Sequence, residues 1–149
     1  MTSTRFVGML STICLMSPLV LSAQSGDTFT ARLAWVPITV QQRADVAGKG
    51  AVTASLSGRT LTISGSFEGL PAPATAARLH RGVARGARGP AISDLTITTK
   101  AASGTISGSV ALSADQVDYL KQGRLYVQVY SEKGADTDGS TLWGWLGGK

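Results

Sequence analysis

A length of 149 residues, a formal charge of +5 and a glycine count of 18 together exclude several classes of protein. The length favours a single domain, and 126 residues after the predicted signal peptide are enough for one hydrophobic core. A single cysteine excludes an intramolecular disulfide, and a basic excess of this size does not by itself predict nucleic-acid binding, so no nucleic-acid partner is expected.

The first residues have the features of a secretory signal peptide in the usual order. Arg5 supplies a positive charge, an apolar run follows from Phe6 to Leu21, and the run leads to the small residue Ala23 before a cleavage point. The cysteine lies inside this run, so the exported protein depends on core packing and not on disulfides. We therefore predict a signal peptide at residues 1–23 and one periplasmic or secreted domain at residues 24–149.

Eight short strands are predicted in the rest of the chain. Apolar residues alternate with polar ones in several segments, for example from Leu61 to Phe67 and from Leu125 to Val129. A period of two buries one face of a strand and exposes the other. The predicted strands are Phe29–Val36, Ala51–Ser57, Thr60–Phe67, Ala76–His80, Ile92–Thr98, Thr105–Leu112, Arg124–Ser131 and Thr141–Leu146.

Two local signals complete the expected fold. The sequence Ser57-Gly58-Arg59 predicts a tight hairpin between the second and third strands. One short helix is predicted near Ala114–Gln122, because Ser113 and Gln116 form a capping box and Gly123 can end the helix. The predicted fold class is therefore all-β, a Greek-key β-sandwich or barrel of about seven or eight strands with one short helix.

Three stretches carry motifs in a specific order. The first runs from Gly69 to Leu95 and includes Ala76-Ala77-Arg78-Leu79-His80, the second runs from Leu112 to Tyr130, and the third from Leu142 to Leu146. Together they resemble the CHRD domain, named after the repeated domain of chordin. The resemblance implies a fold related to the Greek-key barrel of copper/zinc superoxide dismutase.

The chain also departs from the pattern of this family. Of the polar residues that the resemblance assigns to the family, only one histidine is kept, and aromatic residues replace several others. The corresponding positions here are Arg78, His80, Gln128, Tyr130, Thr141, Trp143 and Trp145.

No metal, cofactor or catalytic centre is predicted. A catalytic copper or zinc site needs at least three donors, and His80 is the single histidine of the chain. The sequence Asp136-Thr137-Asp138-Gly139 is interpreted as a polar turn, since no acidic residue follows at the spacing of a calcium loop. The chain is therefore predicted not to be an enzyme. The alternative is a metal-binding, superoxide-dismutase-like protein with a degenerate site.

Four arginines lie close together in the sequence at positions 78, 81, 85 and 88. Gly82, Gly86, Gly89 and Pro90 disfavour a helix here, so a flexible glycine-rich loop is expected. Guanidinium groups bind phosphate, sulfate or carboxylate through paired hydrogen bonds. The alternative is a solvated loop whose charge serves solubility.

Four aromatic residues are expected on one outer face. Tyr126 and Tyr130 alternate with the apolar residues of the seventh strand, and Trp143 and Trp145 do the same on the eighth. Three interpretations remain open: a partner binds this face, a homodimer buries it, or local cover hides it. The local cover would come from Ser131–Gly139 or from the start of the mature chain.

The sequence thus predicts an exported, non-enzymatic binding or structural module of the cell envelope. It is expected to contact a protein or an anionic glycan through an aromatic face and a basic loop. The predicted contact residues are Tyr126, Tyr130, Trp143, Trp145, Arg78, His80, Arg81, Arg85 and Arg88.

Overall fold

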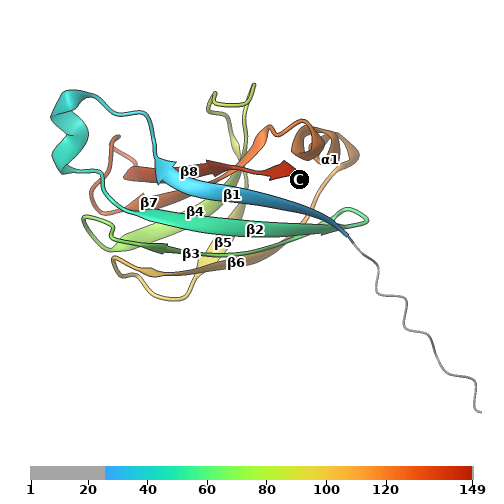
Figure 1. Ribbon diagram of the computed structural model, residues 1–149, viewed down its shortest axis with the longest axis horizontal. Helices are drawn as coiled ribbons and strands as arrows, with labels where there is room; N and C mark the ends of the chain where they lie inside the picture. Colours follow the sequence, from blue (N-terminus) through green and yellow to red (C-terminus); the bar gives the residue numbers. More distant parts are fainter. Residues whose placement is uncertain (1–25, 149) are drawn as a thin grey trace, which may run out of the picture.

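The computed structural model describes residues 26–148, and the predicted signal peptide at residues 1–23 lies outside the described residues. All eight predicted strands are present, and each ends within two residues of its expected position. The elements in chain order (Figure 1) are β1 (Asp27–Trp35), the 3-10 helix η1 (Val40–Ala44), β2 (Lys49–Ser57), β3 (Thr60–Glu68), β4 (Ala74–Arg81), β5 (Ala91–Ile97), β6 (Gly104–Ala111), α1 (Ala114–Lys121), β7 (Leu125–Ser131), β8 (Ser140–Trp145) and β9 (Gly147–Gly148).

The strands form a closed antiparallel barrel. Their order is β2-β3-β6-β5-β4-β7-β8-β1, and the additional pairing of β1 with β2 closes the ring. Strands β4, β5 and β6 are consecutive neighbours, and β7 returns through α1 to lie beside β4, which is a Greek key. The predicted fold class is therefore confirmed, with β9 as a two-residue addition to β1.

The barrel interior is filled by every second residue of the strands. On β3, Leu61 and Ile63 are buried while the threonines between and beside them are exposed, as the alternation predicts. The side chain of Leu120, from α1, is fully buried and covers one end of this core. Because the barrel is closed, all its hydrophobic inner face is shielded without a free sheet edge.

The helix α1 begins and ends where the local sequence predicts. The Ser113 hydroxyl accepts a hydrogen bond from Gln116 N at 3.2 Å, and Gly123 follows the helix with a φ of 69°. The same capping signature occurs at Thr39 and Gln42, where it begins η1, a helix that we did not predict. Within residues 26–148 no helix has the length and apolarity needed to cross a membrane.

Strand β7 departs from the expected pattern. All seven of its residues are buried, although the alternation predicted one exposed face. The inward residues face the barrel core, so a second layer must cover the outward ones. That second layer positions the candidate site.

Candidate functional site

Six of the nine predicted contact residues lie on the outer face of β4, β7 and β8: Arg78, His80, Tyr126, Tyr130, Trp143 and Trp145. Strand register places them in rows across the three strands, and residues of one row project from the same side of the sheet. The prediction that the aromatic residues share one outer face is confirmed. The first row is His80, Tyr126 and Trp145, and the second is Arg78, Gln128 and Trp143.

We call Tyr126, Tyr130, Trp143 and Trp145 the aromatic face. Its side chains pack on each other: the ring centroids of Tyr126 and Trp145 are 4.4 Å apart, and those of Trp143 and Trp145 are 5.4 Å apart. The two tyrosines are only 1% and 4% exposed, and the two tryptophans are partly buried. The two tyrosines are therefore covered, and only the two tryptophans reach the surface.

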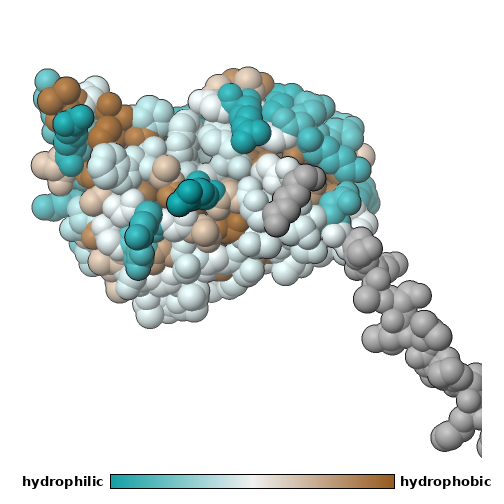
Figure 2. All heavy atoms as spheres, in the orientation of Figure 1, coloured by the Kyte–Doolittle hydropathy of each residue, from teal (hydrophilic) through white to brown (hydrophobic). Residues whose placement is uncertain are grey.

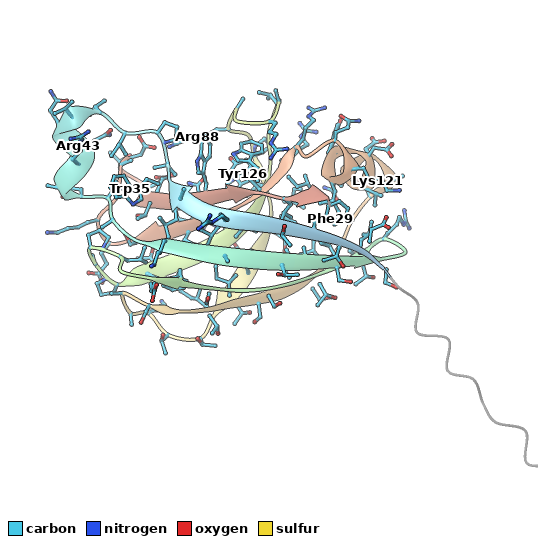
Figure 3. The ribbon with its side chains drawn as sticks, viewed as in Figure 1. Phe29, Trp35, Arg43, Arg88, Lys121 and Tyr126 are labelled. Atoms are coloured by element: carbon cyan, nitrogen blue, oxygen red, sulfur yellow. The ribbon has the colours of Figure 1, made fainter. Side chains whose placement is uncertain are left out.

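Two segments cover the aromatic face. The first is the loop from Gly82 to Pro90 between β4 and β5, which we call the basic loop; Figure 3 shows Tyr126 below it. The second is the β7–β8 loop, whose Ala135 belongs to a small apolar cluster that packs against Trp143. Of the three interpretations, local cover is the one that the described residues support. The sequence pointed to the β7–β8 loop but not to the basic loop.

The basic loop is tied to the face by hydrogen bonds. Gly89 N donates to the Tyr126 hydroxyl at 3.2 Å, and the same hydroxyl lies 3.3 Å from Gly89 O. At the other end of the loop, Gly82 N donates to Arg124 O at 2.8 Å. A Cβ on Gly82 would lie 2.5 Å from Cη2 of Trp145, so the backbone itself rests on the indole. The expected flexible loop is instead held at both ends.

His80 is a buried structural residue within this arrangement. Its ring stacks on Tyr126 with centroids 4.9 Å apart. Nδ1 lies 3.0 Å from Gly89 O, so it must carry the proton, and Nε2 then accepts from the Tyr130 hydroxyl at 2.8 Å. Burial lowers the pKa of His80, which keeps the ring neutral. Both ring nitrogens are occupied, so a metal could bind only by displacing one partner.

The burial of His80 predicts a dependence of stability on pH. Its pKa is lowered in the folded protein, mainly by desolvation, with Arg78 and Arg88 acting in the same direction. The unfolded chain therefore binds more protons, and the free energy of unfolding should fall as the pH drops through 6.5, the ordinary pKa of histidine. Urea denaturation measures this slope, and His80→Gln should flatten it. Equal slopes in both proteins would contradict the assignment.

The acidic residues of the β7–β8 loop are engaged within the protein. Asp136 forms an ion pair with Arg88. The Asp138 carboxylate accepts hydrogen bonds from Ser140 N at 3.0 Å and Oγ at 2.6 Å. Burial raises the pKa of Asp138, but these hydrogen bonds outweigh it and hold the pKa below its usual value. The segment is a polar turn, and residues 26–148 contain no group of three or more potential metal ligands.

Two of the four predicted arginines are neutralised by carboxylates. Arg78 Nε lies 2.8 Å from Asp94 Oδ1, and the guanidinium also lies 5.2 Å from the centre of the Tyr130 ring. The Asp94 carboxylate raises the pKa of Arg78. Arg88 pairs with Asp136. These two side chains are therefore anchors for the aromatic face and the basic loop, with less charge to offer a partner.

Arg81 meets at Tyr119 an arginine that the sequence reasoning missed, Arg124. The guanidinium carbons of Arg81 and Arg124 lie 5.1 Å and 4.4 Å from the centre of the Tyr119 ring. Arg124 Nη2 also donates to Val83 O at 2.8 Å and so holds the basic loop. Arg85 is exposed and lies beside Gly123, the residue that precedes Arg124. A Cβ added to Gly123 would be 3.3 Å from Nη1 of Arg85.

We call Arg81, Arg85 and Arg124 the arginine cluster. Within the described part of the chain, none of the three forms an ion pair with a carboxylate. The Nε atoms of Arg81 and Arg124 are buried and have no hydrogen-bond partner there. Arg124 lies far from the loop in sequence, and only the pairing of β4 with β7, which sets Arg81 opposite Leu125, brings it close.

The family model of the CHRD domain matches residues 29–136. The match spans β1 to β7 and includes Arg78, His80 and the arginine cluster, while Trp143 and Trp145 lie beyond it. No curated protein matches the chain.

Proposed function

The chain belongs to the CHRD domain family, and from this premise we propose that it is an exported, non-enzymatic binding module that holds an anionic partner on its arginine cluster. CHRD domains occur in extracellular and secreted proteins, and the family is in general non-enzymatic. The signal-peptide pattern of residues 1–23 supports export to the periplasm, the cell envelope or the exterior. The partner is a protein or glycan that carries sulfate, phosphate or carboxylate groups.

This proposal rests on the arginine cluster. Its guanidinium groups form no ion pair with a carboxylate of the described residues, and Tyr119 holds two of them in place. Arg81 and Arg124 are stacked on Tyr119, which restricts their side chains before any partner arrives. A restricted guanidinium loses less conformational entropy on binding, so its hydrogen bonds contribute more to affinity. Arg78 and Arg88 already have carboxylate partners and are proposed to stabilise the site from behind.

The aromatic face has a supporting role in this proposal. Tyr126 and Tyr130 are buried, so they hold the basic loop and do not touch a partner directly. Trp143 and Trp145 remain partly exposed and offer apolar contact beside the loop. The smaller open apolar area weakens the case for a homodimer through this face.

Exchange of two cluster arginines tests the proposal. The double variant Arg81→Gln/Arg85→Gln removes two charges but leaves Arg124 to hold the loop. Its affinity for a sulfated hexasaccharide in isothermal titration calorimetry is expected to fall by about tenfold or more, because charge-assisted hydrogen bonds are lost. The matched control is Arg43→Gln/Arg59→Gln, which removes the same charge from exposed positions elsewhere.

The control separates a specific site from general attraction. Affinity in the control variant should stay within about twofold of the unmodified protein, because screened distant charges contribute little. An equal loss in both double variants would show that only net charge matters, and it would reject the arginine cluster. Absence of binding by the unmodified protein would reject it as well.

A further inference from the structure

An open groove lies at the end of the barrel where β1 and β3 finish and β2 and β6 begin. Its volume is about 1090 Å³. Small residues, among them Ala34, Gly50 and Ala51, line it together with Ser66 and Thr105. Figure 2 shows the side of the molecule on which β1 and β2 lie in front, where pale and brown surface lies between isolated teal side chains. None of the arginine-cluster residues lines this groove.

The floor of the groove cannot accept a peptide as an added strand. Arg32 and Leu33 pair with Ala51 and Gly50 on one side, and β3 continues the ladder on the other. Thr105 of β6 pairs in turn with β3. Every strand below the groove therefore has a neighbour on both sides, and no free row of backbone N–H and C=O groups remains for an extended peptide. A ligand must be held by side chains.

Trp35 provides a flat apolar surface in the groove. It is 50% exposed, an unusual state for an indole, and Figure 3 shows it where β1 leads into the segment that carries η1. Its Nε1 donates to Gly48 O at 3.0 Å, which fixes the orientation of the ring. The negative face of an indole attracts the C–H groups of a sugar ring, and a fixed, exposed ring is suited to stacking.

The charges along the groove favour an acidic ligand. Lys49 and Glu68 neutralise each other at 3.3 Å, and both are well exposed. Arg32 is exposed and forms no ion pair within residues 26–148. The groove therefore has an excess of one positive charge. Arg32 and Trp35 are about 10 Å apart along β1 and start from opposite faces of the strand. Both line the groove, because it lies where the strand ends. A few linked sugar rings cover such a separation.

We propose that this groove binds an acidic oligosaccharide, with one sugar ring stacked on Trp35 and a uronate carboxylate bound by Arg32. The guanidinium of Arg32 can hold a carboxylate through two parallel hydrogen bonds. Ser66 and Thr105 line the groove, and hydroxyl groups suit the polar edges of sugar rings. The Thr105 hydroxyl also lies 2.9 Å from Thr98 Oγ1. This second site is separate from the arginine cluster and does not depend on it.

Calorimetric titration with a galacturonate tetramer tests the proposal, with a galactose tetramer of the same linkage as the neutral comparison. The uronate tetramer is expected to bind more tightly than the neutral one. Trp35→Ala should weaken binding of both tetramers by about tenfold or more. Arg32→Gln should remove the preference for the uronate while leaving the neutral tetramer unaffected.

Matched variants keep the test specific. Val83→Ala changes another exposed apolar side chain, and Arg59→Gln removes another exposed arginine, so both should bind the uronate tetramer as the unmodified protein does. Arg81→Gln/Arg85→Gln should also bind it normally, which separates this site from the arginine cluster. If Trp35→Ala unfolds, Trp35→Phe keeps an aromatic ring and should lose only part of the affinity.

Several results would overturn the proposal. One is absence of binding by either tetramer at millimolar concentration. Another is unchanged uronate binding in Arg32→Gln or in folded Trp35→Ala. Competition by a hexaglutamate peptide with the affinity of the uronate tetramer would identify an acidic peptide as the occupant and reject the oligosaccharide.

Discussion

Replacement of Tyr126 by alanine is expected to lower the free energy of unfolding by about 3–5 kcal/mol, the range of large aromatic truncations in a packed interior. Tyr126 is 1% exposed and packs against His80 and Trp145. Its hydroxyl also holds Gly89 of the basic loop. The variant therefore loses ring packing and the attachment of the loop together. Urea denaturation followed by circular dichroism measures the change.

Tyr126→Phe is the matched control, because it keeps the ring and removes only the hydroxyl. It should cost about 1 kcal/mol, the usual net value of one hydrogen bond, with some increase if Gly89 N is left unsatisfied. A loss of less than about 1 kcal/mol in Tyr126→Ala would show that the aromatic face is not packed as described, since such a value fits an exposed side chain.

Gly89→Ala is expected to destabilise the protein by about 3 kcal/mol or more, at the upper end of overpacking. A Cβ at this position would lie 1.9 Å from Arg81 O and 3.0 Å from Arg81 C. Both are backbone atoms, so a change of side-chain rotamer cannot relieve the contact. The loop would have to move away from Tyr126 and His80, which both hydrogen-bond to Gly89. Urea denaturation measures the stability.

Trypsin provides a second, local readout for Gly89→Ala. Arg85 and Arg88 are cleavage sites within the basic loop, and displacement of the loop should speed cleavage there, because proteolysis follows local opening. Gly86→Asn is the matched control. Gly86 has a φ of 84°, a Cβ added to it would meet no atom within 4 Å, and asparagine tolerates that backbone conformation. Equal cleavage of both variants would contradict the tight contact at Gly89.

These predictions connect the aromatic face to the arginine cluster. The basic loop carries Arg85, and Arg124 holds the same loop through Val83 O. If Tyr126→Ala or Gly89→Ala releases the loop, the position of Arg85 relative to Arg124 is lost as well. A drop in affinity for the sulfated hexasaccharide should therefore accompany the drop in stability, although neither variant removes a charge.

The strands and the helix were predictable because their signals are local. Alternation such as that from Leu61 to Phe67 reflects the two faces of a strand and needs no knowledge of its neighbours. The capping box at Ser113 and the glycine at position 123 act within one helical turn at each end. Gly58, with a φ of 60°, similarly marks the β2–β3 hairpin by its own backbone requirement.

The candidate site was only partly predictable, because its contacts join residues far apart in the chain. Tyr130 and His80 are 50 residues apart, and Arg88 and Asp136 are 48 apart. Such long-range contacts decide which arginines form an ion pair and which do not. They also bring Arg124 next to Arg81. The alternation on β7 showed which side chains turn outward, but it carried no information on whether another segment covers them.

The sequence by itself determined the all-β fold, the positions of the eight main strands and of α1, and the aromatic residues that share the outer face of β7 and β8. Local backbone preferences and the period of two depend only on residues that are neighbours in the sequence. The tertiary structure alone decided that the aromatic face is covered, that Arg78 and Arg88 are neutralised, and that Trp35 stands open in a groove. Burial and charge pairing depend on the register of strands and on where loops fold back, and neither is a property of a short segment.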